Sequence, residues 1–202
     1  MFIEQLPSFI RGAYFGVTWR KSSHEKTIYL TFDDGPIPEV TPWVLDILDK
    51  YQIKATFFCV GQNVELYPDV YQDILKRGHR TGNHTFNHIR GFYTGTETYL
   101  ANVEKASTFI QSNLFRPPHG ELRICQLKTL RKKYEVIQWD VITRDYDKDV
   151  PEQKVLDIVK KYARNGSIIV FHDSMKAERN MRYAMPKAIE FLLKEGYQFK
   201  TL

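Results

Sequence analysis

The sequence has few cysteines and no cysteine motif. Its 202 residues include only Cys59 and Cys125, and neither lies in a CxxC or CxxH pattern. A disulfide framework is therefore not expected, which fits a reducing compartment. Cys59 lies in the apolar segment 55–60, and we predict that it is a small buried side chain.

Long apolar runs are also missing. Residues 1–19 are interrupted by Glu4, Pro7 and Arg11, so we expect neither a signal peptide nor a transmembrane segment. The segment leaves two hypotheses open, packing against the domain, which we favour, or weak contact with a membrane surface. Its apolar residues are Phe2, Ile3, Leu6, Phe9, Ile10 and Phe15. The expected location is cytoplasmic, with a membrane-peripheral location or export by another route left open.

No basic stripe with interleaved aromatic residues is present, so nucleic acid is not expected as a partner. The net charge of +5 suits a solubilising surface, or an anionic partner such as phospholipid or an acidic glycan. The length and the hydrophobic fraction of 43% predict one globular domain with a full core. Nothing in the sequence predicts an oligomeric state.

Strand-like apolar segments alternate with segments of helical period along the chain, which predicts a parallel α/β architecture. The chemistry-bearing residues follow the strands, as they do in barrels of this class. His24 and His79 lie in polar contexts and are expected to be solvated. Strands are predicted at 27–32, 55–60, 136–141, 167–171 and 197–202, with a short one before 116. Helices are predicted at 41–51, 68–77, 97–113, 122–133, 151–164 and 185–195.

Two motifs carry the candidate chemistry. Residues 31–36 (TFDDGP) contain Asp33 and Asp34, and residues 82–88 (GNHTFNH) contain His84 and His88. If the second motif forms a helical turn, the two imidazoles project from one face. With an oxygen of Asp34 they would form the three-ligand set of catalytic zinc, a set that also suits non-haem iron. The alternative is that these are ordinary histidines beside turn carboxylates.

Asp33 would be the second element of such a site. A divalent ion lowers the pKa of water from 15.7 to roughly 7, but a base must still accept the proton during attack. A carboxylate one residue before a ligand can lie near that water without binding the ion. The two motifs therefore indicate a metal-assisted hydrolase.

Five segments together resemble the motifs of the polysaccharide deacetylases, which are carbohydrate esterase family 4, also called the NodB homology domain. They are 31–35 (TFDDG), 84–88 (HTFNH), 116–120 (RPPHG), 145–146 (DY) and 170–173 (VFHD). They occur in the family's order, and the resemblance covers roughly residues 27–202. We therefore predict residues 1–26 as an N-terminal segment packing on the domain and 27–202 as the NodB homology domain.

The resemblance implies a distorted (β/α) barrel of about seven parallel strands. It also implies hydrolysis of N-acetyl groups on N-acetylglucosamine-containing glycans, such as peptidoglycan, chitin-like oligomers or related precursors. Asp34, His84 and His88 would hold a divalent metal, with Zn²⁺ preferred and Co²⁺, Ni²⁺ or Fe²⁺ as alternatives.

The resemblance also assigns the proton-transfer roles. Asp33 would be the base, with Arg116 beside it as a cation that favours the ionised carboxylate. His172 would be the general acid, with Asp145 orienting its ring. The acid is needed because an amine anion is a very poor leaving group.

Substrate contacts follow from the same resemblance. The backbone N–H near His119 would help the metal to stabilise the tetrahedral oxyanion. Val170 and Tyr146 would line the slot for the acetyl methyl group. Three residues depart from the family pattern: His119 replaces an aromatic residue, Tyr146 replaces Trp, and Ile142 stands where many members have an acidic residue.

Two other hypotheses share this fold. One is an amide or imide hydrolase of the same superfamily, whose longer members alter the metal motif. The other is a non-catalytic carbohydrate-binding protein, which the presence of Asp33 and His172 disfavours.

Overall fold

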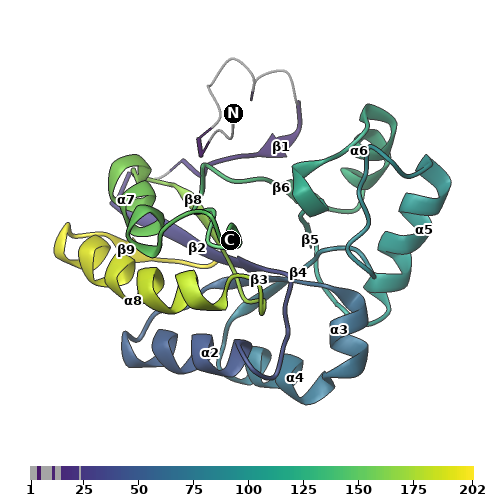
Figure 1. Ribbon diagram of the computed structural model, residues 1–202. Coiled ribbons are helices and arrows are strands. Elements are labelled where there is room, and N and C mark those ends of the chain that lie inside the picture. Colours follow the sequence, from purple (N-terminus) through teal and green to yellow (C-terminus); the bar gives the residue numbers. More distant parts are fainter. Residues whose placement is uncertain (1–3, 6–10, 12–14, 23) are drawn as a thin grey trace.

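A curled parallel sheet organises the protein, and a computed structural model describes it for residues 4–5, 11, 15–22 and 24–202. In this part of the chain, eight strands follow one another in the order β1-β6-β5-β4-β3-β2-β8-β7, and β9 pairs with β2 (Figure 1). Every strand pair is parallel, which confirms the predicted fold class of a distorted barrel. The strands are β1 (Val17–Thr18), β2 (Thr27–Asp33), β3 (Thr56–Cys59), β4 (Arg80–Asn83), β5 (Leu114–Phe115), β6 (Glu135–Ile137), β7 (Val141–Ile142), β8 (Ile168–His172) and β9 (Gln198–Phe199).

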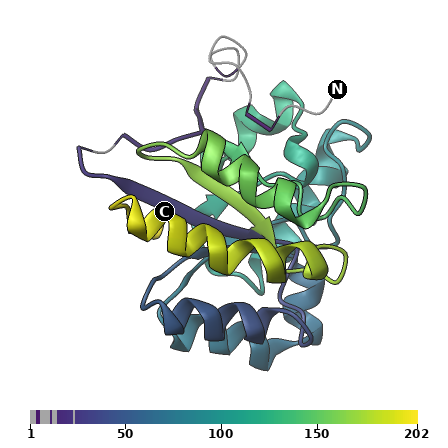
Figure 2. The same ribbon diagram turned by 60° about the vertical axis from the view of Figure 1, so that its left-hand side comes forward.

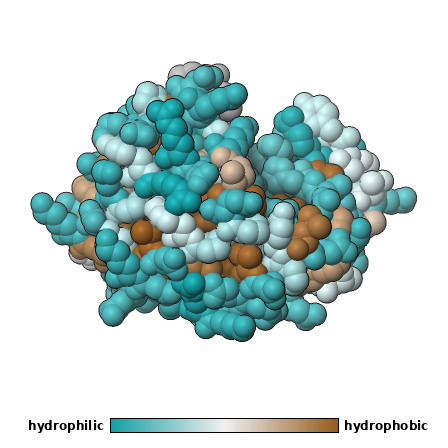
Figure 3. Space-filling model, turned by 60° about the horizontal axis from the view of Figure 1, so that its bottom comes forward, coloured by the Kyte–Doolittle hydropathy of each residue, from teal (hydrophilic) through white to brown (hydrophobic). Residues whose placement is uncertain are grey.

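Seven described α-helices cover the outside of the sheet. In Figure 2, α8 lies between α7 and α2. The face that Figure 3 brings forward is mostly hydrophilic, with hydrophobic patches across its middle. A short 3-10 turn, Pro118–Gly120, follows β5. The helices are α2 (Thr41–Lys50), α3 (Gly61–Leu66), α4 (Pro68–Lys76), α5 (Thr96–Ser107), α6 (Ile124–Leu130), α7 (Glu152–Tyr162) and α8 (Glu178–Lys194).

The central strands are buried on both faces, and the mostly apolar sequences of β3 and β8 suit this environment. Phe32 of β2 pairs in register with Phe57 of β3 and Phe171 of β8, and their ring centroids lie 5.0 and 6.4 Å from that of Phe32. Because successive side chains alternate across a sheet, residues 31 and 33 point to the face opposite this aromatic cluster. The polar residues of β2 are thereby directed away from the helices.

The predicted strand at 136–141 is two strands at distant places in the sheet. β6 pairs with β1 and β5, whereas β7 pairs with β8 at the other end of the order. Between them, the N–H of Gln138 donates to Thr18 O at 2.8 Å and that of Asp140 to Ile168 O at 2.9 Å. The segment between β6 and β7 thus crosses between the two ends of the strand order. The barrel is closed by this crossing segment and not by pairing of its end strands.

Other boundaries also differ from the prediction. The helix predicted at 97–113 ends at Ser107, and the one predicted at 185–195 begins at Glu178 and continues through Pro186. β4 was not predicted, because its sequence RTGN is polar and short. Cys59 is buried as predicted.

The N-terminal predictions fall largely outside the described residues, which exclude Phe2, Ile3, Leu6, Phe9 and Ile10. Phe15 is exposed, and β1 joins the sheet through β6. The boundary at residue 27 stays a prediction. No described helix has the length and apolar character needed to cross a membrane.

His79 is buried rather than solvated, with only 5% of its surface exposed. Its Nδ1 accepts a hydrogen bond from Ala55 N–H at 3.2 Å, and its ring packs edge-on against Phe57. Burial, with a smaller effect of Lys54, lowers its pKa to about 4.

This burial predicts an acid-sensitive contribution to stability. Because the folded pKa lies below the unfolded value, the contribution is complete above pH about 6.5 and is lost as the pH falls through about 4, by at most about 3 kcal/mol. The difference in unfolding free energy between wild type and His79→Asn should therefore shrink from pH 7 to pH 4.5. Denaturant unfolding at both pH values measures it, and an unchanged difference would contradict the prediction.

Candidate active site

The two residues predicted as base and acid lie side by side at the carboxyl edge of the sheet. Asp33 ends β2 and His172 ends β8, and they are register partners on these parallel strands. Register partners on neighbouring strands point to the same face, about 4.8 Å apart. Asp33 is 3% exposed and the side chain of His172 is 12% exposed. The sheet register therefore places a buried carboxylate and a largely buried imidazole side by side.

Asp34, His84 and His88 converge next to this pair. One ligand atom from each lies within 4.8 Å of the others, and Asp34 Oδ1 lies 3.7 Å from His84 Nε2 and 3.1 Å from His88 Nε2. Ligands of a tetrahedral zinc ion lie about 3.4 Å apart. Asp34 Oδ1 is buried and accepts no hydrogen bond. A carboxylate oxygen left without a donor, facing two imidazole nitrogens at these distances, fits a divalent metal site.

The interactions of His84 suit a metal ligand. Its Nδ1 lies 2.7 Å from the carbonyl oxygen of Arg116, so Nδ1–H donates there and Nε2 keeps its lone pair toward Asp34. Burial lowers its pKa to about 4, although the charge of Asp33 opposes this shift. The ring is therefore neutral at physiological pH, as metal binding requires.

The expected helical turn at 84–88 is absent, and the segment is a loop. Thr85 and His88 have left-handed φ values of +64° and +57°. Two asparagines hold the loop: Asn83 Oδ1 accepts the Thr85 N–H at 2.9 Å, and Asn102 Oδ1, from α5, accepts the Phe86 N–H at 2.8 Å. The two imidazoles still meet, but through this folded loop and not through helical spacing.

Asp34 stands in a turn that also has a left-handed backbone, with φ of +86°. Burial alone would raise the pKa of its carboxyl. The imidazoles of His88, His172 and His84 outweigh burial and hold that pKa below its ordinary value. The side chains of Asp34 and His88 remain 27% and 33% exposed, so one side of the ligand group is open to solvent.

Arg116 is fully buried and forms an ion pair with Asp33. Its Nη1 donates to Asp33 Oδ1 at 2.6 Å and to Thr31 Oγ1 at 2.9 Å, and Nη2 donates to the carbonyl of Gln138 at 3.1 Å. The guanidinium lies over the ring of Phe58, 4.1 Å from its centroid. These contacts fix one oxygen of the Asp33 carboxylate and its orientation.

Asp145 is fully buried and binds His172 twice. Its Oδ1 lies 2.7 Å from Nδ1 of the ring, and its Oδ2 accepts the backbone N–H of His172 at 2.8 Å. Burial opposes the charged ring, but the charge and hydrogen bond of Asp145 outweigh it and raise the pKa of His172 to about 9. The imidazolium is therefore the main form at neutral pH.

The three predicted substrate-contact residues surround these groups. The ring of His119 packs edge-on against His88, with centroids 4.8 Å apart, and burial followed by the charges of His88 and Arg90 lowers its pKa. The ring of Tyr146 packs edge-on against His172 at 4.9 Å. Val170 is fully buried, two residues before His172 on the same face of β8.

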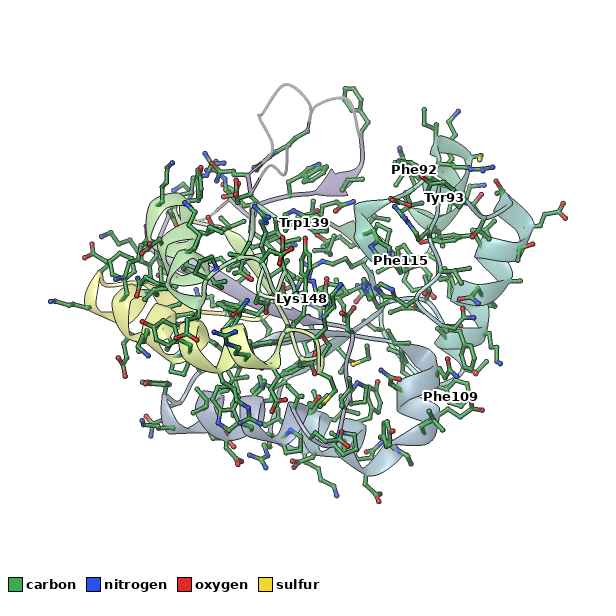
Figure 4. The ribbon with its side chains drawn as sticks, viewed as in Figure 1. Phe92, Tyr93, Phe109, Phe115, Trp139 and Lys148 are labelled. Carbon is green, nitrogen blue, oxygen red and sulfur yellow. The ribbon has the colours of Figure 1, made fainter. Side chains whose placement is uncertain are left out.

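The turn carrying His119 is constrained in its backbone conformation and by its neighbours. His119 and Gly120 both have left-handed φ values, +58° and +72°. A Cβ on Gly120 would lie 2.7 Å from the ring of Trp139, which Figure 4 shows near the middle of the molecule. Gln138 Nε2 also donates to Gly120 O at 2.9 Å. The crossing segment between β6 and β7 thus shapes this side of the site.

Two residues near the site had no signal in the sequence. Gln138 supports Arg116 through its carbonyl and Gly120 through its amide. Asn63, at the start of α3, donates from Nδ2 to the carbonyl of Asp34 at 2.8 Å. Asp140 is remote from the site and pairs with Arg164 and Ser167 at the opposite end of β8.

Comparison with known proteins agrees with this geometry. The family model of polysaccharide deacetylases matches residues 20–139. A peptidoglycan-N-acetylglucosamine deacetylase of Bacillus cereus is 35% identical over 92% of this chain and 91% of its own length. The peptidoglycan-N-acetylmuramic acid deacetylase PdaA of Bacillus subtilis is 32% identical over 98% of this chain and 78% of its own.

A solved structure gives the same result. The crystal structure of the Bc1960 peptidoglycan N-acetylglucosamine deacetylase, in complex with 4-naphthalen-1-yl-N-oxidanyl-benzamide, superposes with a TM-score of 0.86. It covers 98% of this chain and 95% of its own, at 29% identity. The chain therefore belongs to the polysaccharide deacetylase family and is an enzyme of that class.

The bond between Asp145 and His172 leads to a testable prediction for the pKa of His172. Asp145→Asn removes the charge that raises the pKa of His172, so that pKa should fall from about 9 to below 7. Titration of the ring by NMR measures the shift, with the exposed Asp149→Asn as control. An unchanged pKa in Asp145→Asn would show that another group sets the protonation of His172.

Proposed function

We propose that this enzyme is a divalent-metal-dependent N-deacetylase that acts on the amino sugars of peptidoglycan. The observation that carries the proposal is the joint placement of three groups: the Asp33–Arg116 pair, the His172–Asp145 pair and the ligand set of Asp34 and two histidines. The relatives named above act, by their names, on N-acetylglucosamine or N-acetylmuramic acid of peptidoglycan. Their names support peptidoglycan as the substrate polymer, but they differ in which amino sugar is deacetylated.

Asp34, His84 and His88 would hold the metal, with Zn²⁺ as the preferred ion and Co²⁺, Ni²⁺ or Fe²⁺ as alternatives for the same ligands. When bound, such an ion supplies Lewis acidity that polarises the acetyl carbonyl. Asp33 is in place to accept the proton of the attacking water. The bond from Arg116 Nη1 keeps Oδ1 of this carboxylate fixed while the other oxygen is left for the proton.

His172 would complete the reaction. Collapse of the tetrahedral adduct breaks the C–N bond, and the departing nitrogen must take a proton as its electron pair is released. Nδ1 of His172 is held by Asp145, so Nε2 is the atom that donates. With a pKa of about 9 the ring carries this proton at neutral pH. The products are acetate and the free amine of the sugar.

The remaining residues would form the acetyl pocket. The backbone N–H near His119, in a turn tied by the Gly120 N–H to Pro117 O bond of 3.0 Å, would donate to the developing oxyanion. Tyr146 and Val170 would contact the methyl group. Tyr146 lies against the proposed acid, so its ring also limits how a substrate approaches His172.

Metal removal tests the proposal directly. Acetate release should be measured on N-acetylglucosamine oligomers and on peptidoglycan fragments containing both amino sugars, before and after chelation and after zinc is added back. We expect release that chelation abolishes and zinc restores, and Asp34→Ala should lose metal and activity together. No release from any substrate by metal-loaded enzyme would refute the proposal.

Substitution of the acid gives a separate prediction. His172→Ala should lower kcat by roughly 10²–10⁴-fold with metal content unchanged, because this side chain donates a proton and is not a ligand. Steady-state kinetics with metal analysis measures both quantities. His24→Ala, at an exposed histidine, is the control. Unchanged turnover would remove His172 from the acid role.

A further inference from the structure

The turn that carries Asp33 and Asp34 is held from both sides by residues outside the proposed catalytic set. On one side, Val60 N–H donates to Gly35 O at 2.9 Å, and Asn63 Nδ2 donates to Asp34 O at 2.8 Å. On the other side lies Asp173, which follows His172 and is 1% exposed. Neither the proposed proton transfers nor the ligand set uses this buried carboxylate.

Asp173 bonds to the turn through its backbone and through its side chain. Its N–H donates to Asp33 O at 3.1 Å, and its Oδ1 accepts the Gly35 N–H at 3.1 Å. Its Oδ2 accepts the hydroxyl of the fully buried Thr41 at 2.6 Å. Thr41 Oγ1 in turn accepts the Ile37 N–H at 2.8 Å. One carboxylate therefore joins the end of β8, the catalytic turn and the first residue of α2.

The turn has a conformation that needs such support. Asp34 has φ of +86°, a left-handed conformation that is strained for a residue with a side chain. The carboxylate of Asp173 lies directly against the backbone here, since a Cβ on Gly35 would be 1.9 Å from its Oδ2. Strained backbone persists only where its surroundings fix it from several directions. Asp173 supplies the contacts on the β8 side.

We propose that Asp173 and Thr41 form a positioning pair for the metal ligand Asp34 and the base Asp33. The pair holds the turn so that Asp34 Oδ1 faces the two imidazoles while Asp33 stays beside His172. The inference rests on the proposed function for its catalytic consequence, but its consequence for metal binding stands independently. Loss of the pair should weaken metal binding although every ligand is still present.

Variants that remove single bonds test this pair. Thr41→Val removes the hydroxyl at nearly constant volume, and Asp173→Asn replaces one acceptor oxygen with an amide nitrogen that donates. We expect the Kd for Zn²⁺, measured by competition with a chromophoric chelator, to rise by roughly 10–100-fold in both. Thr41→Ser, which keeps the donor, should restore most of the affinity that Thr41→Val loses.

A buried aspartate elsewhere provides the matched control. Asp140 is also fully buried, and it lies at the other end of β8 with Arg164 and Ser167. Asp140→Asn should lower thermal stability without changing zinc affinity, which separates general destabilisation from positioning. Circular dichroism confirms folding, and Thr41→Val remains a test if Asp173→Asn does not fold.

The outcomes separate the two proposals. Weaker zinc binding with rescue by Thr41→Ser supports the positioning pair, even if wild-type enzyme releases no acetate and the proposed function fails. Folded Thr41→Val and Asp173→Asn proteins with wild-type zinc affinity would overturn the pair, whether or not acetate is released. An equal loss of affinity in Asp140→Asn would also overturn it, because the effect would then be general.

Discussion

The buried Arg116 is the residue on which the geometry of the site depends most. Its guanidinium binds Thr31 and Asp33 of β2 and the carbonyl of Gln138, and its own carbonyl accepts the Nδ1–H of His84. One residue therefore orients the proposed base with its side chain and a proposed metal ligand with its backbone. Breaking a buried ion pair by removing one partner costs about 3–5 kcal/mol, because the other charge is left uncompensated. Base and ligand cannot shift independently while this residue is in place.

The alternation of side chains along β2 explains how a polar site and an apolar core coexist in one sheet. Phe32 packs between Phe57 and Phe171 on the helix side, while Thr31 and Asp33 point to the inner face. Both inner side chains have partners, as buried polar groups usually do: Thr31 donates to the carbonyl of Ile169, and Asp33 accepts from Arg116. The strand thus stabilises the fold with one face and holds reactive groups with the other.

Features of the fold and site that depend on local sequence patterns could be predicted from the sequence. Features that depend on hydrogen bonds between distant residues could not. The alternation of apolar and helical segments was enough for the parallel fold, and the motif residues were enough to predict that Asp34, His84 and His88 come together. The splitting of segment 136–141 depends on bonds from Gln138 and Asp140 to strands far away in the chain, which no local pattern contains. The loop at 84–88 likewise depends on Asn102, and the burial of His79 on contacts with residues 55 and 57. The roles assigned to individual site residues stay predictions.

Two histidines of the site, His84 and His172, differ in charge because they bond to different partners. Burial is the largest cause acting on the pKa of both rings, and it lowers both. His84 bonds to a neutral carbonyl, so burial wins and its pKa falls to about 4, which leaves a neutral ring that can bind a metal. His172 bonds to the carboxylate of Asp145, so the charge wins and its pKa rises to about 9, which leaves a proton to donate. The bonded partners, Arg116 O and Asp145, therefore determine which of the two rings is neutral and which is charged.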